Sequence, residues 1–155
     1  MVTLNLTSEQ SLQLTIDRFW ETFPPVWDRI RGNIHLIVAN HFDISVEQFQ
    51  ILRLIRKGAG SVSELATARQ ISRSGMSQAI DILVDKGLIT RTESAEDRRY
   101  TRLELTSQGD DLLDAIFKKN RSWMMEKLAQ LGPEEISGIL CGMEALKKTF
   151  DPAAK

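Results

Sequence analysis

Apolar residues recur at helical spacing through the first quarter of the chain. Thr7 and Gln10 form a capping-box pattern at the start, and the first apolar stripe is Leu12, Ile16, Phe19, Trp20 and Phe23. Pro24 and Pro25 predict that this helix ends and that a second one begins, because proline is tolerated at a first helical position. The second helix is predicted to end near His41, with a stripe made of Trp27, Ile30, Ile34, Ile37 and Val38.

A second group of short helices is predicted between residues 45 and 87. Ser45 and Gln48 repeat the capping-box pattern and open a helix that turns Phe49, Leu52 and Ile55 inward and ends near Gly58 and Gly60. Residues 61–62 are compatible with a very short strand, in which case Ser63 caps the helix that carries Leu65 and Ala66. Ser72 is a natural N-cap, and Gly87 a C-terminal stop, for a helix with a buried face of Met76, Ala79, Ile80 and Leu83.

Beyond Gly87 the apolar period changes from a helical one to an alternation. Residues 88–93 and 100–105 are predicted strands of one hairpin, since Leu103 and Leu105 alternate with Arg102 and Glu104. Two long helices follow. Their apolar stripes are Leu113, Ile116, Phe117, Trp123, Met124, Leu128 and Leu131 in the first, and Ile136, Ile139, Leu140, Met143, Leu146 and Phe150 in the second.

This order of elements predicts a mainly α fold with a small β-hairpin wing. Residues 45–105 are predicted to form a winged helix-turn-helix core, which we expect to be the DNA-binding lobe. Residues 1–44 and 106–155 supply the N- and C-terminal helices of what we expect to be a single intertwined domain. In winged helix-turn-helix units the second helix of the pair enters the major groove of DNA.

Composition adds limits to this picture. The chain has 155 residues, 42% of them hydrophobic and 26% charged, which is typical of one globular domain. It has no apolar run of about twenty residues and no signal-peptide pattern at its start. A single cysteine, Cys141, fits the reducing cytoplasm, where we expect the protein to reside. Two histidines and one cysteine are few for a zinc site, so we expect neither a metal nor a cofactor.

The net charge of −1 hides an uneven distribution. Residues 45–105 hold ten basic and eight acidic side chains, whereas both flanking segments are net negative. This bias is mild, and the positions of the arginines therefore carry more weight than the totals.

The helix after Ser72 offers a polar outer face suited to reading DNA. The candidate contacts are Arg73, Ser74, Gly75, Ser77 and Gln78. Glutamine can pair with adenine, and serine with bases or phosphate, while the helix N-terminus favours a phosphate. Taken alone, this face is equally compatible with an ordinary solvated surface.

The hairpin tip strengthens the DNA-binding interpretation. Arg98 and Arg99 stand at the tip, from which they can reach the adjacent minor groove or its phosphates. Asp97 is better placed to pair with an arginine and to buttress the tip than to touch DNA. Arg91 and Arg102, at the base of the wing, are predicted to add phosphate contacts.

Three segments of the sequence resemble MarR-type transcriptional regulators. They are ISVEQFQILRLI, SVSELATARQISRSGMSQAIDILVDKGLITR and DRRYTRLELTSQG, and the resemblance extends over roughly residues 25–150. The wing pattern of that family is matched by Asp97, Arg99, Leu103, Leu105, Thr106 and Gly109. The resemblance implies that Arg99 enters the minor groove with Asp97 as its buttress. It also implies a homodimer built from the N- and C-terminal helices, residues 1–44 and 106–155, and an effector pocket near the junction with the DNA-binding lobe.

The chain departs from the family at two positions of the predicted recognition helix. The position of Gln78 is often basic in the family, so base preference is expected to differ. Gly75 costs helix stability, about 1 kcal/mol relative to alanine. It either permits close approach of the backbone to DNA or is a tolerated surface residue.

Aromatic and basic side chains suggest where an effector binds. Trp20, Phe23, Trp27 and Trp123 are candidates for lining a pocket for an aromatic ligand, and Arg31, His35 or His41 for receiving its carboxylate. The alternative is that these residues are core aromatics and helix-end histidines.

We expect a sequence-specific double-stranded DNA-binding transcriptional regulator. It is expected to be a repressor that binds a pseudo-palindromic operator as a homodimer and is released by a small aromatic or phenolic effector. One alternative is a winged-helix module that binds another protein and has lost DNA binding, against which the wing arginines argue. An enzyme is not expected, because the sequence shows no nucleophile with a positioned base and no metal motif.

Overall fold

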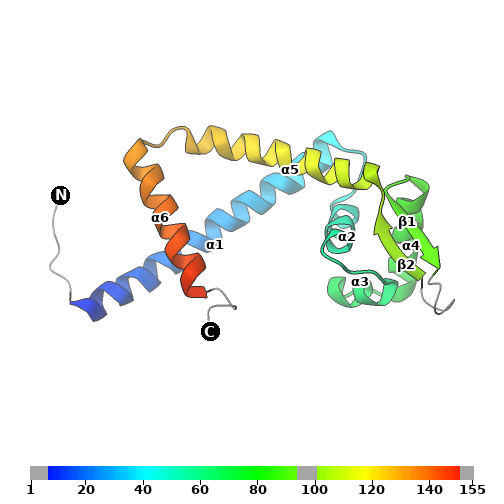
Figure 1. Ribbon diagram of the computed structural model, residues 1–155, viewed down its shortest axis with the longest axis horizontal. Helices are drawn as coiled ribbons and strands as arrows, with labels where there is room; N and C mark the ends of the chain where they lie inside the picture. The colour runs from blue at the N-terminus through cyan, green and yellow to red at the C-terminus, as the bar shows by residue number, and fades with distance from the viewer. Residues whose placement is uncertain (1–6, 94–100, 151–155) are drawn as a thin grey trace. The chain divides into compact units, whose positions relative to one another are not determined.

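The computed structural model describes residues 7–93 and 101–150, and the chain divides into two compact units, residues 1–120 and 121–155. The described residues are mainly helical, with a two-stranded antiparallel wing (Figure 1). The elements are α1 (Ser8–His41), α2 (Val46–Arg56), α3 (Val62–Arg69), α4 (Arg73–Asp85), β1 (Ile89–Glu93), β2 (Thr101–Leu105), α5 (Ser107–Leu128) and α6 (Pro133–Phe150). No helix in these ranges is both long and apolar enough to cross a membrane.

The predicted break at Pro24 and Pro25 is wrong. α1 is one helix of 34 residues that contains both prolines, and it begins with the expected Thr7–Gln10 capping box. Each proline removes one backbone donor. The apolar positions nevertheless keep one unbroken alternation of four- and three-residue steps across the prolines, at residues 16, 20, 23, 27, 30, 34 and 37. A stripe that stays in phase on both sides is the pattern of one continuous helix face.

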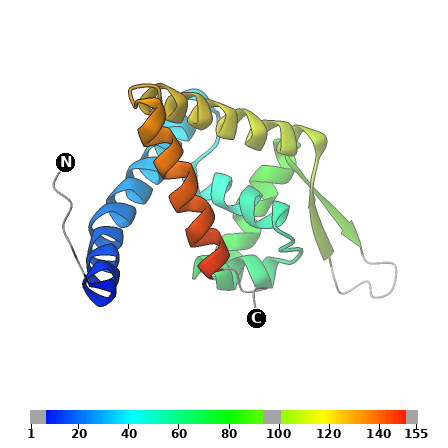
Figure 2. The same cartoon turned by 60° about the vertical axis from the view of Figure 1, so that its left-hand side comes forward.

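α2, α3, α4 and the hairpin enclose the core of the first unit (Figures 1 and 2). The fully buried side chains include Phe49, Ile51 and Leu52 of α2, Leu65 of α3, and Met76, Ile80 and Leu83 of α4. Ile89 and Leu103 contribute from the two strands, and Leu113 and Ile116 from α5. The predicted inward faces of α2 and α4 are thereby confirmed, with Ala79 half-buried at the edge of the core.

The short strand considered at residues 61–62 is absent from the described fold, and Ser63 is not the cap of α3. Ser61 caps this helix instead: its Oγ accepts from Glu64 N at 3.2 Å, while Glu64 Oε2 accepts from Gly60 N at 2.8 Å and from Ser61 N at 3.2 Å. The reciprocal bonds of this capping box fix the helix start two residues earlier than expected. The Gly60 carbonyl still pairs with Leu103 N at 2.9 Å, which ties the turn to the wing.

The hairpin leads directly into α5 through a tight junction. β1 and β2 pair in register from Ile89 opposite Leu105 to Glu93 opposite Thr101. Thr106 Oγ1 donates to the Gly87 carbonyl at 2.6 Å and accepts from Gly109 N at 3.0 Å. The backbone of Gly109 lies so close to Leu88 that only a residue without a side chain fits there.

Polar contacts join α5 to α1 and α2 within the first unit. Asn120 is buried, and its Oδ1 accepts from Asn33 Nδ2 at 2.9 Å. Arg56 of α2 pairs with Asp114 of α5 at 2.6 Å and lies 3.5 Å from Asp110. These polar links therefore tie the first unit's part of α5 to both helices.

The second unit, taken by itself, buries few apolar side chains. None of the residues of α6 is buried. Leu140, Met143 and Phe150 expose 58–74% of their surface. Exposed apolar faces of this kind are typical of protein–protein contact sites.

The junction at Gly109 predicts a sharp stability defect. A Cβ at this position would lie 2.1 Å from the Leu88 carbonyl oxygen. We expect Gly109→Ala to lower the free energy of unfolding by about 1–3 kcal/mol, because overpacking forces the backbone to shift. Urea denaturation followed by circular dichroism measures this. Gly32→Ala is the control, since nothing lies within 4 Å of a Cβ there; equal stabilities for the two variants would contradict the close-packing argument.

Candidate nucleic-acid interface and adjoining pocket

The turn between α3 and α4 fixes the start of the predicted recognition helix. Gln70 adopts a left-handed conformation with φ 55°, and Ile71 N donates to the Ala66 carbonyl at 3.1 Å. Ser72 then caps α4, as predicted, through a bond from Gly75 N to its Oγ at 3.1 Å. The short turn leaves α4 little freedom relative to the end of α3.

The outer face of α4 carries the five candidate DNA contacts. Arg73, Ser74 and Gln78 are exposed, and Gly75 and Ser77 are half-buried. The Ser74 and Ser72 hydroxyls lie 3.1 Å apart, so Ser74 also supports the cap. A Cβ on Gly75 would lie 3.2 Å from the capping Ser72 Oγ. The glycine therefore leaves room for the cap, a role that the sequence did not reveal.

The base of the wing is held to α4 by an ion pair. Arg91 Nη2 of β1 lies 2.7 Å from Asp81 Oδ1 of α4. Arg102 of β2 is mostly exposed, and its Nε lies 3.1 Å from Glu104 Oε1. Both arginines are thus at the surface, as a phosphate contact requires, and each has a carboxylate partner there. Asp97, Arg98 and Arg99 lie outside the described residues.

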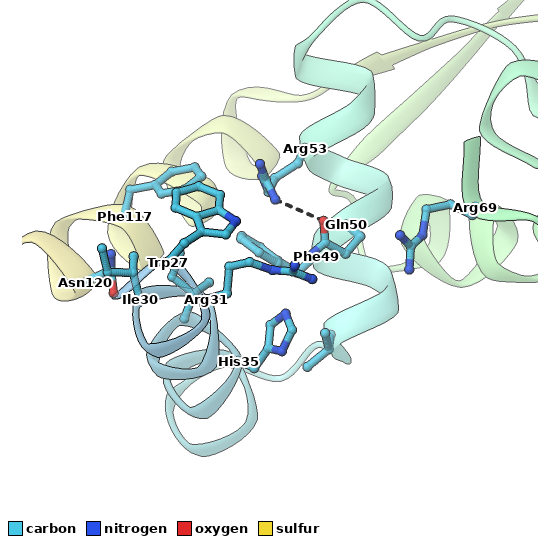
Figure 3. Close-up of a pocket in the computed structure, with 12 residues that line it drawn as sticks. Trp27, Ile30, Arg31, His35, Phe49, Gln50, Arg53, Arg69, Phe117 and Asn120 are labelled. Atoms are coloured by element: carbon cyan, nitrogen blue, oxygen red, sulfur yellow. Dashed lines mark hydrogen bonds between the residues drawn. The ribbon is translucent and has the colours of Figure 1, made fainter. Parts of the chain in front are cut away.

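A pocket of about 510 Å³ lies within the first unit, beside this lobe. It has mixed apolar, aromatic and basic walls (Figure 3). Its lining residues are Trp27, Ile30, Arg31, Ile34, His35, Val46, Phe49, Gln50, Arg53, Arg69, Phe117 and Asn120. The volume is within the usual range for small-molecule sites.

Three of the seven predicted effector residues come together in this pocket: Trp27, Arg31 and His35. Trp20, Phe23, His41 and Trp123 are not among its lining residues. α1 places the three on adjacent turns, and Figure 3 shows Arg31 extending from α1 toward α2. The Arg31 side chain makes no hydrogen bond or ion pair with any other described residue, so its guanidinium can receive an anion.

The residues contributed by α2, α3 and α5 were not predicted. The Phe49 and Phe117 rings lie 6.0 Å apart between centroids. The Arg53 guanidinium lies 5.6 Å from the Phe49 centroid, a cation–π contact, and donates to Gln50 Oε1 at 3.0 Å. The sequence predicts Phe49 only as a core residue, because its position beside Phe117 depends on the tertiary fold.

Arg69 reaches the pocket from the end of α3 while holding Glu47 of α2. Its Nε and Nη2 donate to the two carboxylate oxygens of Glu47 at 2.9 and 2.7 Å. These hydrogen bonds lower the pKa of Glu47 and raise that of Arg69, and partial burial opposes both shifts. Both side chains remain about a third or more exposed, so the pair contributes only about 0–1 kcal/mol to folding.

The pocket walls present basic side chains to a ligand. Arg31, Arg53, Arg69 and His35 line it, and the twelve described lining residues include no carboxylate. With tryptophan and phenylalanine rings alongside, these walls suit a flat apolar molecule that carries an anionic group.

Comparisons with known proteins agree with this architecture. Residues 42–99 match a model of the MarR family. The chain is 32% identical over 116 residues to the uncharacterized HTH-type transcriptional regulator YpoP of Bacillus subtilis (strain 168), covering 74% of this chain and 81% of that protein. It is also 32% identical over 88 residues to the HTH-type transcriptional repressor MdtR of the same organism, covering 57% of each.

Solved structures share the fold. The transcriptional regulator Tm0710 from Thermotoga maritima superposes with a TM-score of 0.74 at 24% identity, covering 84% of this chain and 95% of that one. A single-substitution mutant of S. aureus MepR bound to an oligodeoxyribonucleotide gives a TM-score of 0.65 at 20% identity, covering 86% and 98%. The winged helix-turn-helix geometry, the match to the family model and the similarity to YpoP agree. The chain belongs to the MarR family of HTH-type, DNA-binding transcriptional regulators.

Proposed function

We propose that the protein is a homodimeric transcriptional repressor that binds a pseudo-palindromic operator and is released by a small aromatic or phenolic effector. The observation that carries the DNA-reading part is the division of α4 into two faces. Met76, Ile80 and Leu83 are fully buried, the opposite face presents Ser74 and Gln78 to solvent, and Arg73 is exposed in the first turn. This is the placement that a major-groove helix needs.

Two relatives support the finer assignment. MdtR is named a repressor, and the MepR mutant was solved with an oligodeoxyribonucleotide. For this chain we propose that α4 reads base edges, with Arg73, Ser74, Gly75, Ser77 and Gln78 at the DNA surface. Arg98 and Arg99 then reach the minor groove with Asp97 as buttress, and Arg91 and Arg102 leave their carboxylate partners for phosphates.

Exposed apolar faces support the homodimer. In α1, Leu12, Ile16 and Trp20 expose 56–67% of their surface, and in α6 Leu140 and Phe150 expose 61% and 74%. Such faces cost free energy in water and are covered in a two-fold symmetric interface. A dimer of this kind sets two copies of α4 about one helical turn of DNA apart, roughly 10 bp.

The pocket beside the DNA-binding lobe supports the effector. It combines cationic side chains with Trp27, Phe49 and Phe117. An effector whose ring meets these aromatics and whose phenolate or carboxylate meets Arg31 or His35 suits that lining. Bound there, it lies between the long N-terminal helix and the helix-turn-helix.

Base reading by α4 predicts a change in sequence preference for Gln78→Ala. We expect this variant to lose discrimination at one position of each half-site, by roughly 1–3 kcal/mol, because a paired contact to a base edge is lost. Binding-site selection from random DNA, followed by competition titrations with single-base variants, measures the change. Gln130→Ala, at an exposed position beyond α5, is the matched control. A uniform loss of affinity on every sequence would instead assign Gln78 to the DNA backbone.

Minor-groove insertion predicts a change in salt dependence for Arg99→Ala. The variant should bind the selected operator markedly more weakly, since a narrow minor groove concentrates negative potential. The slope of log affinity against log salt should flatten by up to about one unit, while the melting temperature stays nearly unchanged. Arg29→Ala, an exposed arginine of α1, should leave the slope alone. An Arg99→Ala protein with wild-type affinity and slope would remove the wing from the interface.

The proposed interface predicts dissociation when its apolar faces acquire charge. Trp20→Glu and Leu140→Glu should shift the protein from dimer to monomer in sedimentation velocity at micromolar concentration, because each places a carboxylate in a dry contact. Operator affinity should fall as the dimer dissociates. Ile82→Glu is the control for sedimentation alone: Ile82 is 47% exposed and lies outside the proposed dimer helices, but it is on α4, the helix proposed to read DNA. Dimers that persist in both variants would show that these faces are not the interface.

A further inference from the structure

Arg69 has two roles in the first unit. It lines the pocket, and it holds both carboxylate oxygens of Glu47. Figure 3 shows its side chain reaching from α3 toward α2. A ligand that carries a carboxylate therefore contacts a guanidinium that already binds a carboxylate through two hydrogen bonds.

The Glu47–Arg69 pair lies next to the DNA-reading helix. Arg69 is the last residue of α3, and Ser72, three residues later, is the N-cap of α4. The intervening turn is closed by backbone bonds from Gln70 N to the Thr67 carbonyl and from Ile71 N to the Ala66 carbonyl. Glu47 is in the first turn of α2, whose Phe49, Ile51 and Leu52 are fully buried. The pair thus fastens the end of α3 to a helix fixed in the core.

We propose that the anionic group of an effector in this pocket displaces Glu47 from Arg69, and that this exchange loosens the end of α3 and thereby the N-terminus of α4. The proposal rests on the effector function proposed above and names the ion pair through which release is transmitted. Ligand binding then lowers DNA affinity because the ligand favours the arrangement in which the Glu47–Arg69 pair is open.

The exchange is chemically balanced. Arg69 gives up one carboxylate and gains another, so it is never left without a partner. Glu47 is released at a partly exposed site, where water and the positive end of the α2 dipole stabilise its charge. Ligand binding is therefore driven by burial of the aromatic ring against the apolar walls. The ion pair with Arg69 makes this binding selective for an anion.

The other cations of the pocket are less suited to transmit the signal. Arg53 is engaged with the Phe49 ring and with Gln50 on its own helix. Arg31, on α1, has no described partner to lose. Arg69 is the pocket cation whose described ion pair joins two separate helices of the DNA-binding lobe.

The experiment compares naphthalene-1-acetate with its neutral amide, 1-naphthaleneacetamide. Both have the same ring, and only the first presents a carboxylate. Calorimetry gives the affinity of each probe, and fluorescence anisotropy gives the affinity for a DNA site selected from random sequence. The proteins are the wild type, Glu47→Gln, Arg69→Gln and the control Asp114→Asn, which removes an exposed ion pair between α2 and α5 away from the pocket lining.

For the wild type we expect naphthalene-1-acetate to bind more tightly than the amide and to lower DNA affinity about two- to fivefold, since opening a partly exposed ion pair supplies no larger effect. Glu47→Gln should bind the carboxylate about two- to fivefold more tightly, since the internal competitor is gone. Its DNA affinity without ligand should fall up to about fivefold. Arg69→Gln should lose the preference for the carboxylate over the amide. Asp114→Asn should match the wild type throughout.

The outcomes separate the two proposals. A wild type that releases DNA with naphthalene-1-acetate, together with a Glu47→Gln protein unchanged in both affinities, overturns the exchange and leaves the effector function standing. A wild type that binds neither probe, or binds without any change in DNA affinity, counts against the effector function and the exchange together. If Arg69→Gln fails to fold, Glu47→Gln decides alone, because it keeps the shape of the native side chain and removes its charge.

Discussion

Burial of one face of α4 is the constraint on which the rest of the first unit depends. Met76, Ile80 and Leu83 are fully buried among residues of α2, α3 and the hairpin. This packing fixes which residues of α4 are left on the outside, and it fixes the strand that carries Arg91 beside Asp81. A change in the core therefore displaces the surface that we propose as the DNA interface, since close-packed interiors transmit displacement.

Local signals were strong enough to predict most elements of the DNA-binding lobe. Ser45 and Ser72 cap helices as expected, and Gly87, with φ 68°, ends α4. The structure overturns two expectations that depend on a local residue preference alone. At Pro24 and Pro25, the continuous apolar phase of α1 outweighs the helix-breaking chemistry of proline. At Ser61, the capping box with Glu64 outweighs the β propensity of residues 61–62.

The pocket was only partly predictable, for a physical reason. Trp27, Arg31 and His35 follow one another on a single helix, so their spacing already implies a shared face. Tertiary packing brings Arg69 and Phe117 next to these three residues. The spacing of residues along the sequence does not predict this proximity. The buried Asn33–Asn120 bond, between residues 87 apart in sequence, is of the same kind. Side chains that come from several elements can be assigned to a common pocket only once the fold is known.

The ion pair between Arg91 and Asp81 has a consequence for how the protein searches DNA. An arginine that already holds a carboxylate at 2.7 Å presents a nearly neutral dipole to a distant phosphate, and acts as a cation only after the partner is exchanged at close range. The paired arginine therefore adds little to the loose electrostatic association of the protein with DNA, which depends on net charge at a distance. In the interface proposed above, Arg91 therefore adds to the affinity of the docked complex and little to the rate of encounter, which separates specific binding from binding to arbitrary sequence.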